Sequence, residues 1–147
     1  MKDYIPLSVP SIKGNEWNYI KECLDTEWVS SAGKYVELFE KKIAEYTGVK
    51  FAVACVNGTS ALQVSLRLSG VMPSDEVIVP TLTFIAPVNA IAYNGATPVF
   101  MDTDDYYNID IEKTLEFIYN ETIYRDGITY NKITNKRIIA ILPVHIW

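Results

Sequence analysis

The chain of 147 residues, 49% of them apolar, is long enough to form a domain with a hydrophobic core. A net charge of −5 without a long run of Lys or Arg argues against nucleic acid or an anionic membrane as a partner. Two cysteines and one histidine support neither a metal site nor a disulfide framework, and no apolar run reaches the length of a membrane span. We therefore expect a cytoplasmic protein without a bound metal.

The first part of the chain predicts an extended arm followed by two amphipathic helices. Prolines keep residues 1–13 out of a helix. Apolar residues at helical spacing then predict a helix from Asn15 to about Thr26 and a second helix that Gly48 ends. The residues between these helices, 27–34, are mostly small and polar, so we expect a loop there.

Residues 51–68 predict a buried strand, a tight turn at Asn57-Gly58 and then a helix. Thr59 and Ser60 fall in the first turn of that helix. A helix that begins directly after a strand directs unpaired N–H groups and the positive end of its dipole beyond the strand, where a phosphate can bind. The alternative is an ordinary α/β junction in which Thr59 or Ser60 only caps the helix. Neither G-x-x-x-x-G-K-[ST] nor G-x-G-x-x-G is present, so the local sequence by itself favours the ordinary junction over the phosphate site.

Strands and helices alternate along the rest of the chain. The predicted strands are residues 51–56, 77–80, 97–101 and 138–142. Two of the intervening helices begin at the capping residues Thr83 and Asp110. This alternation predicts the α/β class, with a mostly parallel sheet flanked by helices. Ligands of such sheets bind beyond the carboxyl ends of the strands. The loops at that edge are residues 57–60, 81–84, 102–105 and 143–147.

Short motifs occur in a distinctive order along nearly the whole chain. They are Ile5-Pro-Leu-Ser8, Glu27-Trp-Val-Ser-Ser-Ala-Gly33, Asn57-Gly-Thr-Ser-Ala-Leu62, Asp75-Glu-Val-Ile-Val-Pro-Thr81 with Thr83-Phe84, Gly95-Ala-Thr-Pro-Val-Phe100 and Pro143-Val-His145. Their order and spacing resemble the DegT/DnrJ/EryC1/StrS family of pyridoxal-phosphate-dependent sugar aminotransferases. That family has the aspartate-aminotransferase fold, called fold type I, in which a large α/β domain precedes a smaller one. By this resemblance, residues 1–147 are the amino-terminal arm and the first part of the large, cofactor-binding domain. The end of the chain directly after an apolar run favours the same expectation of a longer protein.

The resemblance implies a site for pyridoxal 5′-phosphate (PLP). The N–H groups of Thr59 and Ser60 would hold the phosphate, and Gly58 would allow its close approach. Phe84 would stack on the pyridine ring, with packing in the core as the alternative for this side chain. The resemblance also implies a contact between the loop after the first helix and a nucleotide-linked sugar, with packing as the alternative role of the tryptophan. The loop residues concerned are Trp28, Val29, Ser30 and Ser31.

In the DegT/DnrJ/EryC1/StrS family, an amino group moves from a donor, usually glutamate, to a keto group of a nucleotide-linked sugar during amino-sugar and surface-glycan biosynthesis. Members work as homodimers. The chemistry needs a lysine that forms a Schiff base with the cofactor. In the family this lysine lies beyond the position where this chain ends, so we expect no catalytic residue within the 147 residues and no activity of the chain alone. Two alternatives stay open, namely a relative that uses the cofactor for sugar dehydration and an inactive truncated module for binding or dimerisation.

Overall fold

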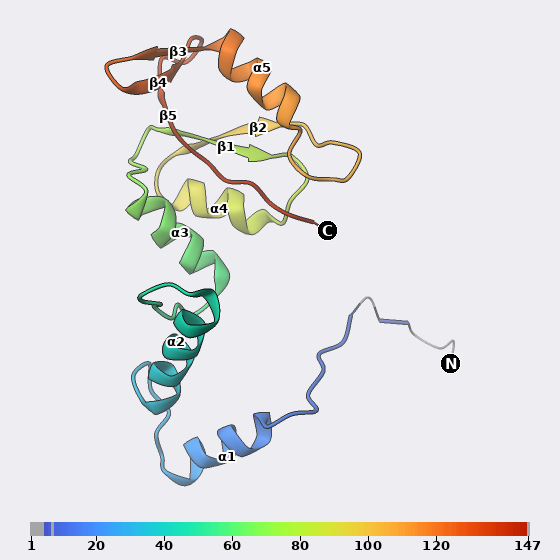
Figure 1. Cartoon of the computed structure of the whole chain (residues 1–147), viewed down its shortest axis with the longest axis vertical. Coiled ribbons are helices and arrows are strands. Elements are labelled where there is room, and N and C mark those ends of the chain that lie inside the picture. The colour runs from blue at the N-terminus through green and yellow to red at the C-terminus, as the bar shows by residue number, and fades with distance from the viewer. Residues whose placement is uncertain (1–4, 7, 147) are drawn as a thin grey trace. The chain divides into compact units, whose positions relative to one another are not determined.

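The computed structural model describes residues 5–6 and 8–146, and the chain divides between residues 54 and 55 into two compact units (Figure 1). The predicted arm falls partly outside the described residues, as does the last residue of the predicted 143–147 loop. The described part of the arm contains no helix, as predicted. Every helix of the described chain is too short or too polar to cross a lipid bilayer.

The first unit contains two helices, α1 (Glu16–Asp25) and α2 (Lys34–Thr47), where the sequence predicts them. Gly48 ends α2 with a φ of 75°, a left-handed conformation that glycine adopts without a steric penalty. The rings of Tyr19 and Tyr35 lie 5.1 Å apart between their centroids and connect the two helices. None of the residues in these two fully described helices is buried, so most of their apolar side chains remain accessible.

Residues 51–56 are extended but belong to no strand of the described chain, so the predicted buried strand is wrong. The side chains of Phe51, Val53 and Val56 are exposed. The backbone shows why, because the Ala54 N–H donates to Oε1 of Glu40 at 2.8 Å instead of to a neighbouring strand. An apolar pattern alone does not make a strand, since a strand also needs a partner for its backbone groups.

The second unit contains a five-stranded sheet with helices on both faces (Figure 1). Its elements are α3 (Gly58–Leu68), β1 (Glu76–Pro80), α4 (Ile85–Tyr93), β2 (Thr97–Met101), α5 (Ile111–Glu121), β3 (Thr122–Arg125), β4 (Ile128–Asn131) and β5 (Arg137–Ile141). The strands lie in the order β2-β1-β5-β4-β3. Strand β1 pairs in parallel with β2 on one side and with β5 on the other. The predicted α/β class is therefore confirmed.

The other half of the sheet is antiparallel, because β3 and β4 form a hairpin that the sequence analysis missed. Asp126 and Gly127 connect the strands, with φ angles of 51° and 80°. Positive φ at both central residues is typical of a type I′ turn, for which Asp-Gly is a preferred sequence. The sheet is consequently mixed and not mostly parallel, and the alternation of strands and helices is interrupted at the hairpin.

The core lies on both faces of β1, whose five residues are all buried. Val77 and Val79 point to one face, where they join the cluster formed with α3 and α4. Ile78 points to the opposite face and joins the cluster beneath α5. This alternation is the ordinary period of a strand, and burial on both faces explains the continuous apolar run. Strand β1 is thus the rigid centre from which the loops at its carboxyl end are positioned.

Buried polar contacts fasten the hairpin to the amino end of β1. The Glu76 side chain accepts hydrogen bonds from Nδ2 of Asn131 at 2.9 Å and from Oγ1 of Thr134 at 2.8 Å. The adjacent Asp75 carboxylate binds Arg137 through two hydrogen bonds, of 2.7 Å and 2.6 Å. The hydrogen bonds to Asp75, followed by the attraction of its negative charge, raise the pKa of Arg137 above its usual range. Both carboxylates are therefore satisfied by partners within the fold.

Candidate functional site

The first turn of α3 is capped by Asn57 and not by Thr59 or Ser60. Oδ1 of Asn57 accepts a hydrogen bond from the Ser60 N–H at 2.9 Å, and the Asn57 carbonyl accepts one from the Ala61 N–H at 3.1 Å. The N–H groups of Gly58 and Thr59 have no acceptor among the residues that the structure describes. Two donors therefore remain at the positive end of the helix, as an anion site requires.

Gly58 is the first residue of α3, and a Cβ placed there meets no atom of the described chain within 4 Å. Packing within the chain therefore gives no reason for a glycine at this position. Glycine in a helix costs roughly 0.5–1 kcal/mol relative to alanine. The close approach of a ligand to the backbone is a physical reason that fits this open position.

Phe84 lies directly after the loop that follows β1 and is the N-cap residue of α4. Its side chain is 81% exposed, so the alternative of core packing does not hold within the described chain. The expectation that Thr83 caps α4 is wrong, because the helix begins one residue later. The Thr83 hydroxyl is buried and has no hydrogen-bond partner among the described residues. The structure thus presents an accessible aromatic ring near the carboxyl end of β1.

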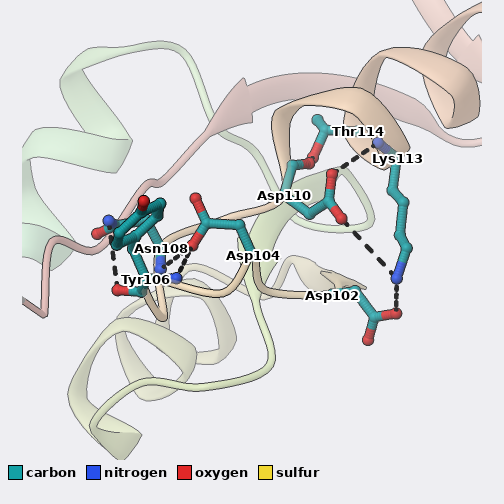
Figure 2. A network of polar contacts seen from close by, with 7 residues as sticks. All are labelled: Asp102, Asp104, Tyr106, Asn108, Asp110, Lys113 and Thr114. Carbon is teal, nitrogen blue, oxygen red and sulfur yellow. Dashed lines mark hydrogen bonds and ion pairs between the residues drawn. The ribbon is translucent and has the colours of Figure 1, made fainter.

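The loop between β2 and α5 is held by its own aspartates (Figure 2). Oδ1 of Asp104 accepts hydrogen bonds from the N–H groups of Tyr106 and Asn108, each at 2.9 Å. Asp110 caps α5 as predicted, by accepting from the Lys113 N–H at 3.0 Å. The Lys113 ammonium lies 2.6 Å from Asp102, and that hydrogen bond is the main cause that raises the lysine pKa. The hydrogen bonds of Asp104 and Asp110 thus hold the loop and the start of α5. No group of three or more potential metal ligands occurs in the described chain.

In the first unit, the loop between α1 and α2 lines a cavity of about 490 Å³. Trp28 and Ser30, two of the residues predicted to contact a sugar nucleotide, lie in its wall. Val29 lines a second depression with Tyr19, and Ser31 is exposed. Of the four residues predicted to contact the sugar nucleotide, only Trp28 and Ser30 therefore line the same cavity.

The shape of this loop depends on Trp28. Its indole N–H donates to the carbonyl of Ala32 at 2.8 Å, which closes the loop into a ring. Gly33 follows with a φ of 148°, and a Cβ there would lie 2.1 Å from the Trp28 Nε1 atom. Only glycine allows the indole to pack so closely at the start of α2.

A charged group that the sequence analysis missed also lines this cavity. The Glu22 carboxylate accepts from Lys34 through one oxygen and from the Tyr35 hydroxyl through the other, each at 2.5 Å. The bond from Lys34, followed by the bond from Tyr35, lowers the pKa of Glu22, while bonding to Glu22 raises the pKa of Lys34 and of Tyr35. At neutral pH the group is an ion pair joined to a neutral phenol. No periodic pattern relates residues 12 positions apart, so the sequence carried no signal for it.

The second unit is an α/β domain with two N–H donors that have no acceptor in the described chain at the start of α3 and an accessible aromatic ring after the loop that follows β1. The chain belongs to the DegT/DnrJ/EryC1/StrS aminotransferase family, whose model matches residues 10–147. This finding confirms the resemblance identified from the motifs.

Several named proteins are similar to this chain in sequence. The chain is 43% identical over 143 residues to GDP-perosamine synthase of Caulobacter vibrioides. This alignment covers 97% of the chain and 34% of the relative. It is 48% identical over 120 residues to GDP-perosamine synthase of Escherichia coli O157:H7, covering 81% of the chain and 33% of the relative. The chain therefore spans about a third of the length of these relatives.

Solved structures support the fold. The PLP form of a putative sugar aminotransferase, Spr1654 from Streptococcus pneumoniae, aligns with a TM-score of 0.69 and 33% identity, over 76% of this chain and 29% of that protein. A DegT DnrJ EryC1 StrS aminotransferase from Brucella abortus aligns with a TM-score of 0.69 and 36% identity, over 88% of this chain and 32% of that protein. The described chain therefore has the fold of part of these two aminotransferases.

Proposed function

We propose that this chain is the amino-terminal part of a PLP-dependent aminotransferase that transfers an amino group, with glutamate as donor, to a nucleotide-linked keto sugar. The observation that carries the proposal is the pair of unpaired N–H groups at the start of α3, in a chain of this family. The relatives named GDP-perosamine synthase favour a GDP-linked sugar as the substrate and polysaccharide biosynthesis as the setting.

The residues at the start of α3 and Phe84 carry groups that would suit the cofactor. The N–H groups of Gly58 and Thr59 would bind its phosphate, and the absence of a Cβ at Gly58 leaves room for that contact. The Ser60 N–H already donates to Asn57, so Ser60 would contribute its hydroxyl. Phe84 would support one face of the pyridine ring. When bound, PLP supplies the electron sink that makes the transfer of the amino group possible.

The remaining parts of the proposal concern the whole protein. The lysine that reacts with the cofactor would lie outside these 147 residues, which would be inactive alone. The full-length enzyme would be a homodimer in the cytoplasm. Free thiols at Cys23 and Cys55 fit a reducing compartment. In the first unit, Trp28, Val29, Ser30 and Ser31 are proposed to face the nucleotide sugar.

Titration of PLP with the 147-residue chain, followed by phosphorus-31 NMR, tests the phosphate site without depending on activity. Thr59→Pro removes one N–H at a position in the first helical turn, where proline is tolerated. We expect this variant to weaken PLP binding about tenfold, the typical effect of losing one charge-assisted hydrogen bond. Thr59→Ala, the matched control, keeps the N–H and should bind PLP nearly as the parent does. Equal losses in two variants with unchanged circular dichroism would exclude backbone binding of the phosphate.

A further inference from the structure

Strand β3 forms an open edge of the five-stranded sheet in the second unit. It lies last in the strand order and pairs with β4, and no strand of the described chain lies beyond it (Figure 1). The opposite edge strand, β2, contains Pro98, which has no N–H group to offer to a further strand. Strand β3 contains no proline, and its pairing with β4 runs without a register shift. One edge of the sheet is therefore protected against further pairing, and the other is not.

The hydrogen-bonding pattern of the hairpin indicates which backbone groups of β3 face the open edge. In an antiparallel pair, residues that bond to the neighbouring strand alternate with residues whose backbone groups point away from it. The Lys132 N–H donates to the Glu121 carbonyl at 2.9 Å, and this pair continues the register of the hairpin. The odd-numbered residues of β3 therefore face β4. The N–H of Tyr124 and the carbonyl of Thr122 point to the open edge.

We propose that β3 pairs with β3 of a second copy of this chain, antiparallel and about a two-fold axis at Ile123. In this register the Tyr124 N–H of each copy donates to the Thr122 carbonyl of the other copy. Each copy has one such edge, so the two-fold contact closes with a dimer and does not extend into a fibre. The contact involves the second unit alone and does not depend on the proposed function.

The side chains on one face of this pairing complement each other across the axis. Alternation along the strand places Glu121, Ile123 and Arg125 on the same face. With the axis at Ile123, the two isoleucines lie opposite each other, and Glu121 of each copy lies opposite Arg125 of the other. All three side chains are exposed, so they can reach a second copy. An axis at Tyr124 would instead set Ile123 opposite Arg125, so the charges favour the first register.

The guanidinium of Arg125 is held in position for this contact. It lies 4.2 Å from the centre of the Tyr130 ring, and Nη2 donates to Oδ1 of Asn135 at 3.1 Å. A guanidinium has five N–H donors, so several remain for a carboxylate. No ion pair of Glu121 occurs within the described chain, so its carboxylate is available. A side chain that is already ordered loses less entropy when it binds.

Sedimentation velocity of the 147-residue chain, from about 1 μM to about 1 mM, tests the pairing. We expect a weak monomer–dimer equilibrium, because four residues in each strand form a small interface. Arg125→Glu and Glu121→Arg each set like charges opposite each other at two symmetry-related places. Each variant alone should therefore dimerise about tenfold more weakly than the parent. Glu116→Arg, an equal change of charge on the exposed surface of α5, is the matched control and should dimerise as the parent does.

An equal mixture of Arg125→Glu and Glu121→Arg provides the decisive measurement. Both cross-copy pairs of the mixed dimer again have opposite charges. The mixture should therefore recover the parent affinity to within about threefold. Damage to the hairpin within one copy could not be repaired by a second copy, so this recovery separates a contact between copies from a loss of folding.

A second pair of variants tests the backbone contact. Tyr124→Pro removes the outward N–H, and Tyr124→Thr keeps it with a residue that favours strands. We expect the proline variant to dimerise at least about tenfold more weakly and the threonine variant to lose no more than about threefold. Hydrogen exchange of the β4 amides checks that the hairpin persists in both variants.

The remaining outcomes contradict the inference. A parent chain that stays monomeric over the whole concentration range would exclude the pairing. Dimers of equal strength in the parent and in both charge variants would show that the chain associates through another surface. A mixture that recovers no affinity would exclude the register with its axis at Ile123. The PLP titration with Thr59 variants measures a different property, so the two proposals can fail separately.

Discussion

In the second unit, the polar groups at the amino end of β1 are buried and paired, whereas the groups considered for ligand binding are accessible. At the amino end, the carboxylates of Asp75 and Glu76 are buried and hydrogen-bonded by residues around β4 and β5. At the carboxyl end of β1, the Phe84 ring is exposed, and at the start of α3 the Thr59 N–H has no acceptor in the described chain. A buried polar group costs free energy unless it is paired, whereas an unpaired group at the surface is available to a ligand. The amino end therefore stabilises the fold, whereas the N–H groups at the start of α3 and the Phe84 ring are not used by the fold in the described chain.

The largest effect on stability is expected at the amino end, from Asn131→Leu. This change removes the hydrogen bond to Glu76 and leaves a 2% exposed carboxylate beside an apolar side chain. We expect the free energy of unfolding to fall by about 3 kcal/mol, measured by urea denaturation. Asn120→Leu, on the exposed surface of α5, is the control and should change stability far less. Similar small losses in both variants would mean that the buried contact contributes little.

A smaller loss is expected from Gly127→Val in the hairpin turn. Valine at a φ of 80° is strained, which costs roughly 1–2 kcal/mol. Hydrogen exchange of the β3 and β4 amides should accelerate, because the hairpin register depends on this turn. Gly58→Ala provides the contrast, since its Cβ has open space in the described chain and alanine favours a helix. Equal destabilisation by the two substitutions would contradict the need for a positive φ at Gly127 in the turn.

Local signals in the sequence predicted the helices because their causes lie within a few residues. Asp110 caps α5 and Gly48 ends α2 where the sequence places them. The Asp126-Gly127 dipeptide carried an equally local hairpin signal, which was present in the sequence but not used. The mixed sheet could therefore have been predicted.

Features that depend on distant partners could not be predicted in this way. Residues 51–56 have an apolar strand pattern, but pairing needs a neighbouring strand that local sequence does not specify. Glu22 and Lys34 meet only because the loop closed by Trp28 brings α1 and α2 together. The phosphate role of Thr59 and Ser60 was one of two interpretations of the local sequence, and the family resemblance favoured it and added Phe84. The structure adds that the N–H groups of Gly58 and Thr59 have no acceptor in the described chain and that the Phe84 ring is exposed.

The smallest effect on stability is expected from Phe84→Leu, which offers the most direct test of the carboxyl end. Because the ring is 81% exposed, its replacement should change the free energy of unfolding by no more than about 0.5 kcal/mol. Binding of PLP should nevertheless weaken about fivefold, as expected from the loss of one aromatic stacking contact. Tyr106→Leu is the matched control, an exposed aromatic residue in the neighbouring loop that should change neither quantity. If Phe84→Leu instead destabilised the chain as strongly as Asn131→Leu, the ring would be a packing residue, and the carboxyl end would serve the fold in the same way as the amino end.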